Sequence, residues 1–522
     1  MKNSFLVFLL ITILSCSAFA AEIEEAPVVW LDSGPISGKM EDGVREYLGI
    51  PYAAAPIGKL RWKIPRDVGQ WKDVRKCTEF GPSCPQINPY NNLPKISEDC
   101  LYINVWTSAK SRSEKLPVMV WIHGGAWNFG SSAIKEYDGL NLAKKSVVMV
   151  SFNYRLGPFG FWAHPRLAME SSRNISGNYG FLDQIMALWW VQWNIDAFGG
   201  DPQNVTIFGE SAGSANVTLL MVSPLAKGLF HRVIAQSGGP MVGLSYLIPK
   251  ANGDMQEAIK MGETLAARLK CDKDKDVVAA MRRKSTAQIL EAADFKMGLF
   301  DKGLFFAPVF DGWAIPSDPV AAYSSGEQQD VPVVIGSNKD EGTAFISASD
   351  LSAKKYKLFM DGRFGKNSKQ AMEIFPAKKN EETGKALNKA ITVSAFAEPA
   401  RFVADSMKGK RSKAYLYQFT RVPNTADAKK AGAYHGLDVV YVLGNLNSAE
   451  GYDEKDAELS RLMMDCWINF AKAGDPNGPG LPGWPSYDRR ADQNLEFGDS
   501  VKINDHLFEK ECDFVENLRK ER

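Results

Sequence analysis

Residues 205–213 read VTIFGESAG, and this stretch decides the fold class. The apolar and β-branched run 205–208 is typical of a buried strand, and the following residues 214–222 can form a helix. A strand that turns sharply into a helix through Gly-x-Ser-x-Gly exposes the serine side chain at the edge of an α/β sheet. Glycine on either side leaves room for a strained serine and for close strand–helix packing. The sequence therefore predicts that Ser211 is a nucleophile.

Other apolar runs predict the sheet that surrounds this turn. They cover residues 117–122, 146–152, 232–236, 331–336 and 414–419. Continuous apolar runs bounded by Gly or Pro suit strands that are covered on both faces. A helical pattern over 181–198 stops at Gly199 and Gly200, and alternating strands and helices predict a mostly parallel central sheet with helices on both faces. Residues 240–310 and 345–400 lack this alternation, so we expect them to be inserted segments over one end of the sheet.

The composition bounds the class of protein. The chain has 522 residues, of which 45% are hydrophobic, enough for a large core. Lys and Arg number 62 against 61 Asp and Glu, and this balance gives no reason to expect nucleic acid or an anionic membrane as a partner. No segment after the leader is apolar enough to cross a membrane. We expect residues 21–522 to form a single catalytic domain.

The first twenty residues resemble a signal peptide. Lys2 supplies the positive charge, residues 5–14 supply the apolar stretch, and Ala18 and Ala20 supply a small-residue cleavage site. This leader predicts a secreted or periplasmic protein. The alternative is a lipid anchor on Cys16, but the bulky Leu14 favours cleavage after Ala20.

A serine nucleophile needs a base, and the order of residues in this architecture narrows the choice. In α/β enzymes of this kind the acid and then the histidine follow the serine. His231 comes too soon after Ser211, and His506 lies among charges near the C-terminus. His435 follows the predicted strand 414–419 and a glycine-containing loop. A lone histidine is more often structural, yet position and elimination select His435 as the base.

The acid should lie at the end of an intervening strand. The run 331–336 leads directly into SNKDEG at 337–342. Asp340 and Glu341 both fit by position, and a solvated charged turn is the structural alternative. The residues alone leave this choice open.

Backbone donors for an oxyanion are expected opposite the serine. The predicted strand 117–122 runs into HGGAW at 123–127, where glycines let N–H groups face a cavity. Together with Ala212 this loop can form a three-donor oxyanion hole. The alternative is an ordinary strand–loop connection, but these parts all fall just beyond strand ends, where α/β sheets place their sites.

Cysteine usage argues against a metal site. Beyond the leader there are six cysteines, and neither paired CxxC units nor a His/Cys cluster occurs. The nearby Cys77, Cys84 and Cys100 suggest one disulfide in an exported protein. We expect neither a metal nor a cofactor.

Longer motifs around these residues carry a family resemblance. They read YLGIPYA at 47–53, SEDCLY at 97–102, NYRLG at 153–157, GNYG at 177–180 and FGGDP at 198–202. With the Ser211 turn they resemble the type-B carboxylesterase family, which includes the cholinesterases and has the α/β-hydrolase fold. The likeness covers about residues 30–515.

The resemblance implies roles for individual residues. It selects Glu341 as the acid and His435 as the base, and it implies an oxyanion hole made by Gly125, Ala126 and Ala212. By the same likeness Glu210 and Ser237 lie next to the triad.

It also implies structural links. Arg61 and Glu98 are expected to form one buried ion pair, and Arg155 and Asp183 another. The family's first disulfide maps to Cys84 and Cys100. Cys271 is expected to be free, because its family partner region contains no cysteine.

The implied activity is hydrolysis of carboxylic esters, with a small-molecule ester as substrate. Small to medium neutral esters are expected, because the segment between Cys84 and Cys100 lacks a tryptophan for a quaternary ammonium. Trp127, Phe305, Phe306 and Phe396 are expected to line the substrate pocket. Alternatives are a lipase or amidase of the same fold, or a binding protein that has lost catalysis, although the retained serine argues against the last.

Overall fold

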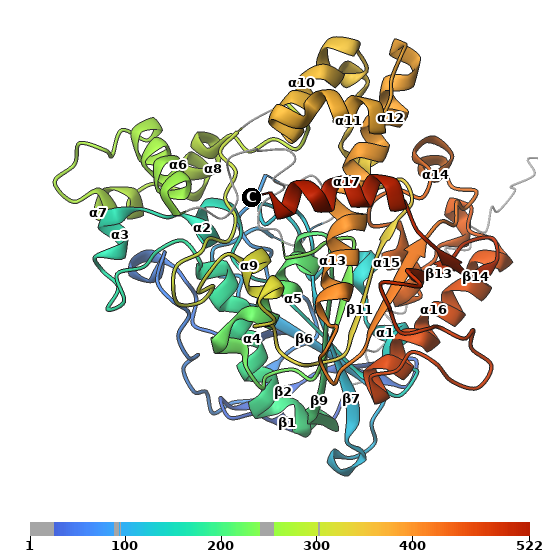
Figure 1. The fold of residues 1–522 in the computed structure, drawn as a ribbon. Helices are drawn as coiled ribbons and strands as arrows, with labels where there is room; N and C mark the ends of the chain where they lie inside the picture. The colour runs from blue at the N-terminus through green and yellow to red at the C-terminus, as the bar shows by residue number, and fades with distance from the viewer. Residues whose placement is uncertain (1–25, 88–92, 94, 241–254, 301–302, 522) are drawn as a thin grey trace, which may run out of the picture.

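The computed structural model describes residues 26–87, 93, 95–240, 255–300 and 303–521 (Figure 1). The predicted signal peptide and Cys16 lie outside these residues. Within them, no helix is both long and apolar enough to cross a membrane.

The described residues form an eleven-stranded sheet in the order β14-β13-β12-β11-β10-β9-β7-β8-β6-β4-β3. In chain order its strands are β3 (Lys39–Glu41), β4 (Val44–Pro51), β6 (Tyr102–Thr107), β7 (Leu116–Ile122), β8 (Val148–Phe152), β9 (Gly200–Glu210), β10 (Arg232–Gln236), β11 (Val333–Asn338), β12 (Ala414–Phe419), β13 (Gln493–Phe497) and β14 (Val501–Asp505). A smaller sheet joins β1 (Val29–Trp30), β2 (Pro35–Ser37) and β5 (Arg75–Lys76).

The strand directions confirm the predicted mostly parallel sheet. Neighbouring strands from β8 through β7, β9, β10, β11 and β12 to β13 run parallel. Among the described strands of this large sheet, antiparallel pairing occurs only towards the two edges, at β13–β14 and at β8–β6–β4–β3. Parallel strands need crossover helices, so the central strands are covered on both faces and read as continuous apolar runs.

The two faces of β7 illustrate this coverage. Val118 and Val120 pack into the core cluster on one face, whereas Met119 and Trp121 pack into the cluster on the other. The first face is covered by α4 (Tyr179–Asn194), α5 (Ala212–Val222) and α13 (Glu398–Ser406), and the second by α1 (Leu140–Ala143), α15 (Leu437–Leu443) and α16 (Glu454–Ala473). Side chains alternate across a strand, which places these neighbours on opposite faces.

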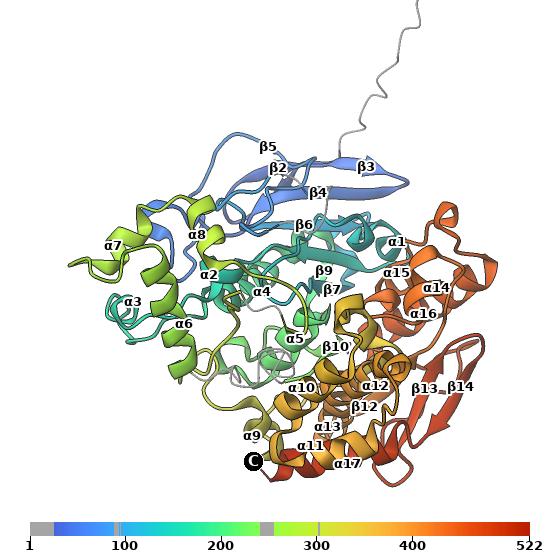
Figure 2. The same cartoon turned by 90° about the horizontal axis from the view of Figure 1, so that it is seen from above.

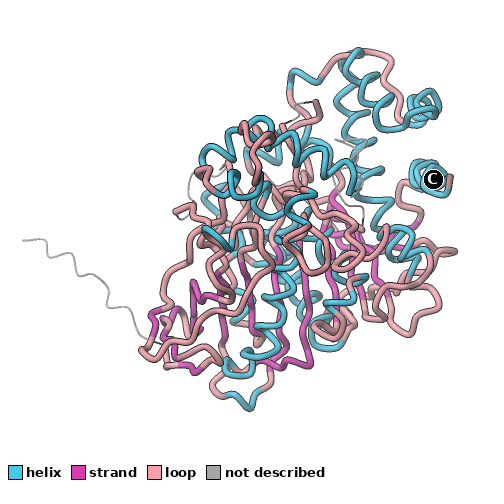
Figure 3. The backbone as a smooth tube through the Cα atoms, turned by 90° about the vertical axis from the view of Figure 1, so that its left-hand side faces the viewer, coloured by secondary structure: helices cyan, strands magenta, loops and turns pink. Residues whose placement is uncertain are grey.

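The two predicted insertions are largely helical. The first contains α6 (Met255–Arg268), α7 (Val277–Arg282) and α8 (Thr286–Ala293), and the second α10 (Ala353–Phe364), α11 (Ser368–Ile374) and α12 (Asn380–Thr392). The second insertion shares its own core cluster with the C-terminal helix α17 (Glu509–Lys520), and Figure 2 shows these helices grouped together. Figure 3 shows the strands side by side in the lower part of the molecule, with many of the helices above them.

The remaining helices are short. They are α2 (Gly157–Phe161), α3 (Pro165–Ala168), α9 (Pro319–Ser324) and α14 (Ala426–Ala431).

Both expected ion pairs are present. The Arg155 and Asp183 side chains are 3% and 0% exposed, and Nη2 of Arg155 lies 2.7 Å from Oδ1 of Asp183. Nη2 of Arg61 lies 2.6 Å from Oε1 of Glu98. In both pairs Nε bonds the second carboxylate oxygen, at 2.7 Å. Such two-pronged pairs satisfy a buried charge, and they tie loops to the helical layer.

Candidate active site

The turn between β9 and α5 presents Ser211. Its backbone has φ 58° and ψ −121°, a conformation that is strained for a residue with a side chain. A Cβ on Gly213 would lie 1.9 Å from the carbonyl oxygen of Ile122, and one on Gly209 would lie 2.6 Å from the same oxygen. Glycine is therefore required on both sides of Ser211 for the turn to pack against β7.

His435 lies beside a buried carboxylate at the end of β11. Its Nδ1 is 2.6 Å from Oε2 of Glu341, which is fully buried. The other oxygen of Glu341 accepts the backbone N–H of Asn338 at 2.6 Å. With both carboxylate oxygens bonded, Glu341 holds the imidazole in one orientation.

Asp340, the other candidate acid, faces away from His435. Its carboxylate accepts hydrogen bonds from Nδ2 of Asn388 at 2.9 Å and from the backbone N–H of Ala433 at 3.1 Å. The backbone N–H of Asp340 also donates to the carbonyl oxygen of Ala433. Asp340 thus fastens the loop that precedes His435 to the end of β11.

Glu210 occupies the other side of the imidazole. Its Oε1 lies 3.1 Å from Nε2 of His435, and the structure contains no hydrogen bond between Oγ of Ser211 and His435. Burial raises the pKa of Glu210 to about 8, with the charges of Asp438 and Glu341 adding to the shift. Burial disfavours a charged His435, yet Glu210 and Glu341 outweigh it and raise its pKa to about 9. The two carboxyl groups therefore shift the protonation equilibrium of His435 toward the imidazolium.

The loop after β7 supplies free backbone donors. Gly125 has φ 106° and Ala126 φ 53°, and a Cβ on Gly125 would lie 2.0 Å from the carbonyl oxygen of Phe129. In the described part of the chain, the N–H groups of Gly125, Ala126 and Ala212 donate no backbone hydrogen bond. These three donors are consequently available to an oxyanion beside Ser211.

A cavity of about 290 Å³ opens onto Ser211 and His435. Its other lining residues are Gly125, Ala126, Phe129, Ile134, Glu136, Tyr137, Glu210, Met297, Tyr434, Gly436, Leu437, Val439, Val440 and Tyr452. Most of this wall is apolar or aromatic, as is usual for a small-molecule pocket.

The four aromatic residues expected in the pocket do not contribute to the described lining of this cavity. Trp127 instead donates from Nε1 to Oδ1 of Asn216 at 2.8 Å, and its ring meets Phe305 edge to face. Phe306 is buried and its carbonyl oxygen accepts Nδ2 of Asn128. Sequence reasoning missed Tyr137, Tyr434 and Tyr452 as lining residues. Tyr137 ends a short 3-10 helix, Lys135–Tyr137, and the other two lie in connecting segments, so their positions depend on chain paths that the sequence does not reveal.

Phe396 lies against the ring of His435 and is not among the residues of the described cavity wall. It belongs to a turn of π-helix, Val393–Ala397, and its ring centroid is 4.9 Å from that of His435. Phe345 stacks on Phe396 and lies 5.1 Å from the same imidazole. These two rings and Glu341 confine His435 on three sides.

Ser237 follows β10 beneath the Ser211 turn. It is fully buried with φ 53°, and its backbone N–H donates to the carbonyl oxygen of Gly336. Its hydroxyl has no hydrogen-bond partner among the described residues. Ser237 therefore lies next to the end of β11 and forms no hydrogen bond with the side chains of Ser211, Glu341 or His435 in the described part of the chain.

The other histidines make local contacts. His123 stacks on Tyr154 at 4.5 Å, and burial lowers its pKa to about 4, so it is neutral. His231 accepts the backbone N–H of Val205, and His164 accepts that of Arg166. His506 is exposed. Among the described residues, none of these four side chains forms a hydrogen bond with Ser211, Glu341 or His435.

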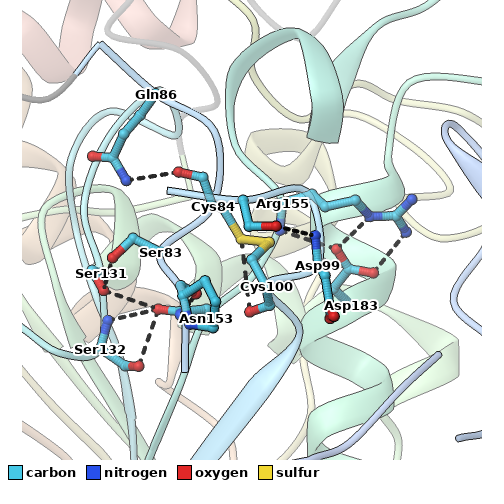
Figure 4. The surroundings of a disulfide bond; sticks show 12 residues. Ser83, Cys84, Gln86, Asp99, Cys100, Ser131, Ser132, Asn153, Arg155 and Asp183 are labelled. Carbon is cyan, nitrogen blue, oxygen red and sulfur yellow. Dashed lines mark hydrogen bonds and ion pairs between the residues drawn. A yellow bond between two sulfur atoms is a disulfide. The ribbon is translucent and has the colours of Figure 1, made fainter. Parts of the chain in front are cut away.

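The predicted disulfide between Cys84 and Cys100 is present and supports the segment after the donor loop (Figure 4). Nε2 of Gln86 donates to the carbonyl oxygens of Cys84 and Gly130, and Oε1 of Gln86 accepts the N–H of Gly130. Cys77, Cys271, Cys466 and Cys512 are free and buried. Among the described residues no cluster of three or more His, Cys, Asp or Glu side chains is arranged to hold a metal.

The sheet order, the strained serine after β9 and the carboxylate–histidine pair beyond β11 and β12 define the α/β-hydrolase class of enzymes. Over residues 25–515 the chain matches the carboxylesterase family model. It is 34% identical to the para-nitrobenzyl esterase of Bacillus subtilis (strain 168), covering 92% of this chain and 97% of that one.

Other relatives agree. The fumonisin B1 esterase of Sphingopyxis macrogoltabida is 33% identical over 94% of this chain and 89% of its own. Carboxylesterase 1D of Mus musculus is 33% identical, and the match covers 98% of this chain and 96% of that protein. A solved PNB esterase structure superimposes with a TM-score of 0.81 at 32% identity, covering 94% of this chain and 99% of that one. The protein belongs to the carboxylesterase family and is a carboxylic ester hydrolase.

Proposed function

We propose that the protein hydrolyses small to medium neutral esters through an acyl-enzyme formed on Ser211. His435 is the general base, and Glu341 is the carboxylate member of the triad. The observation that carries this proposal is the strained Ser211 turn beside the 2.6 Å contact between His435 and Glu341. Backbone strain at a half-buried serine persists only where the surrounding packing enforces it, and it is typical of reactive sites.

The reaction has two steps. His435 removes the Ser211 proton as Oγ attacks the ester carbonyl, and it then donates that proton to the leaving alkoxide. The N–H groups of Gly125, Ala126 and Ala212 bind the oxyanion, and Glu341 stabilises the imidazolium. Water activated by His435 then hydrolyses the acyl-enzyme and restores Ser211.

The substrate must redirect His435 for this to occur. In the resting site Nε2 faces Glu210 at 3.1 Å. Catalytic hydrogen bonds often tighten only in the substrate complex. Glu210 serves as a second, temporary partner that keeps the imidazole in place, and a neutral ester suits the largely apolar cavity beside it.

Domain organisation and location belong to the same proposal. Residues 21–522 form one catalytic domain, and residues 1–20 are removed on export. The disulfide between Cys84 and Cys100 supports an oxidising destination. Lipid attachment at Cys16 is the alternative route to the same compartment.

Ser211→Ala tests the mechanism. Loss of a triad nucleophile typically costs on the order of a millionfold in kcat, and the thermal midpoint should be unchanged because the turn keeps its glycines. The wild type should release a stoichiometric burst of p-nitrophenol from p-nitrophenyl acetate, and the variant none. Steady turnover by the pure variant, well above the uncatalysed rate, refutes the assignment.

A further inference from the structure

A buried carboxylate that the proposed mechanism does not use lies beneath the triad. Asp438 is fully buried at the start of α15, three residues after His435. Its Oδ2 accepts hydrogen bonds from Nε2 of Gln236 and from the hydroxyl of Tyr417, both at 2.9 Å. Its Oδ1 accepts Nδ2 of Asn338 at 3.2 Å. Burial raises the pKa of Asp438, and the hydrogen bonds donated by Gln236, Tyr417 and Asn338 oppose that shift.

Gln236 links Asp438 to the nucleophile. Gln236 is the last residue of β10, and its backbone carbonyl oxygen accepts the N–H of Ser211 at 2.9 Å. Its side chain is held from both ends, because Nε2 bonds Asp438 and Oε1 accepts Nε1 of Trp467. The residue that holds the Ser211 backbone is therefore anchored on Asp438.

Asn338 links Asp438 to the acid and to the base. Asn338 ends β11, and its backbone N–H bonds Glu341 at 2.6 Å. Its Nδ2 is shared between Asp438 and the carbonyl oxygen of Tyr434, the residue before His435, at 2.7 Å. One side chain thus joins the segments that carry Glu341 and His435.

We propose that Asp438 is a positioning residue that fixes the Ser211, Glu341 and His435 segments relative to one another through the hydrogen bonds that its carboxyl group accepts. This inference rests on the proposed function of the triad. It explains why a carboxylate occupies a fully buried site that an amide or an apolar group could fill. A buried charge is costly unless several donors satisfy it, and here those donors are the groups that must be held in place.

The charge has a measurable consequence for pH dependence. The carboxyl groups that contact His435 are Glu341 on Nδ1 and Glu210 on Nε2, and the buried Asp438 acts on it electrostatically without a direct contact. A negative charge favours the imidazolium, so Asp438 raises the pKa of His435 and loss of its charge lowers it. Since the base must be neutral to act, the rising limb of kcat/KM moves with that pKa.

Asp438→Asn is the test, with kcat expressed per active site titrated by the p-nitrophenol burst. We expect kcat to fall by about 10- to 100-fold, as small misplacements of catalytic groups do, with KM changed less than about threefold. The rising limb should move to lower pH by roughly half a unit. Asp438→Glu, which keeps the charge, should retain the wild-type limb while kcat falls.

Asp456→Asn is the matched control. Asp456 is equally buried and accepts a tyrosine hydroxyl, from Tyr441 at 2.7 Å, but its other partners lie at the start of α16 and at Arg421. Asp456→Asn should lower the stability of the protein, while the rising limb of the pH profile of kcat/KM and the kcat per active site should stay unchanged. A purely structural role for Asp438 predicts the same behaviour for Asp438→Asn, and that result overturns the proposal.

If Asp438→Asn does not fold, Tyr417→Phe decides, because it removes one donor and keeps the carboxylate. A kcat several-fold lower at constant KM supports the proposal, and an unchanged kcat overturns it. Ser211→Ala in the same series separates the two hypotheses. Turnover by Ser211→Ala refutes the triad itself, whereas an inactive Ser211→Ala with superimposable profiles for Asp438→Asn and the wild type refutes only the role of Asp438.

Discussion

Nδ1 of His435 lies 2.6 Å from Oε2 of Glu341, although 94 positions separate the two residues in the chain. The carboxylate of the adjacent Asp340 accepts hydrogen bonds from Nδ2 of Asn388 and from the backbone N–H of Ala433. Two neighbouring acids thus have separate duties, one toward the imidazole and one toward the loop that carries it. This division gives the first prediction.

Glu341→Gln should lower kcat by several orders of magnitude. An amide at this position can donate to Nδ1 and so stabilises the wrong tautomer, which costs about 10⁴-fold in a well-studied triad. Asp340→Asn should mainly lower the thermal midpoint, because the amide can no longer accept both of its hydrogen bonds. Steady-state kinetics and thermal unfolding of the two variants distinguish them. A larger loss of kcat in Asp340→Asn contradicts the assignment.

Glu210→Gln should shift the pH profile. Glu210 and Glu341 together raise the pKa of His435 to about 9, so the wild-type kcat/KM should rise with pH well above the ordinary histidine range. Removing the Glu210 charge lowers the pKa of His435, and the limb should move to lower pH by about one unit or more. The measurement is kcat/KM for p-nitrophenyl butyrate from pH 5 to 10. An unmoved limb shows that Glu210 does not act on the imidazole.

The disulfide should contribute mainly to stability. Cys84 and Cys100 are separated by 16 positions, and the chain-entropy relation assigns about 3 kcal/mol to closure of such a loop. The double variant Cys84→Ser, Cys100→Ser should lose about this much in the free energy of unfolding. Its kcat below the transition should fall only modestly, because Gln86 still bonds Gly130. Cys77→Ser is the control, and an equal loss of stability from it argues against a specific role for the bridge.

The value of kcat/KM should rise gradually with the length of the acyl chain and then fall for long chains. Each buried methylene contributes about 0.8 kcal/mol, or roughly a fourfold gain in kcat/KM, while the chain still fits the apolar wall. The cavity of about 290 Å³ is finite, so p-nitrophenyl esters should improve from acetate to butyrate and decline for long chains. Activation by long-chain emulsions, with palmitate as the best substrate, contradicts this and indicates a lipase.

Much of the fold could be predicted from the sequence because its signals are local. The strand before Ser211, the stop at Gly199 and the glycines of the turn each follow from periodicity and steric demand over a few residues. β10 and β12 begin and end where their apolar runs do. The order of residues along the chain then selected His435 as the base, because it follows both Ser211 and the candidate acids.

Relationships across the sheet were decided only by the tertiary structure. Asp340 and Glu341 are adjacent and chemically alike, and only the packing of the end of β11 against the loop before His435 separates them. Trp127 and Phe305 were expected in the pocket, yet their rings pack against each other and are not among the residues that line the described cavity. Asp438 carried no sequence signal, because its role depends on strand ends that the parallel register brings together. Local sequence determines which residues form an element, whereas the contacts between strand ends depend on register and loop packing, which no single segment encodes.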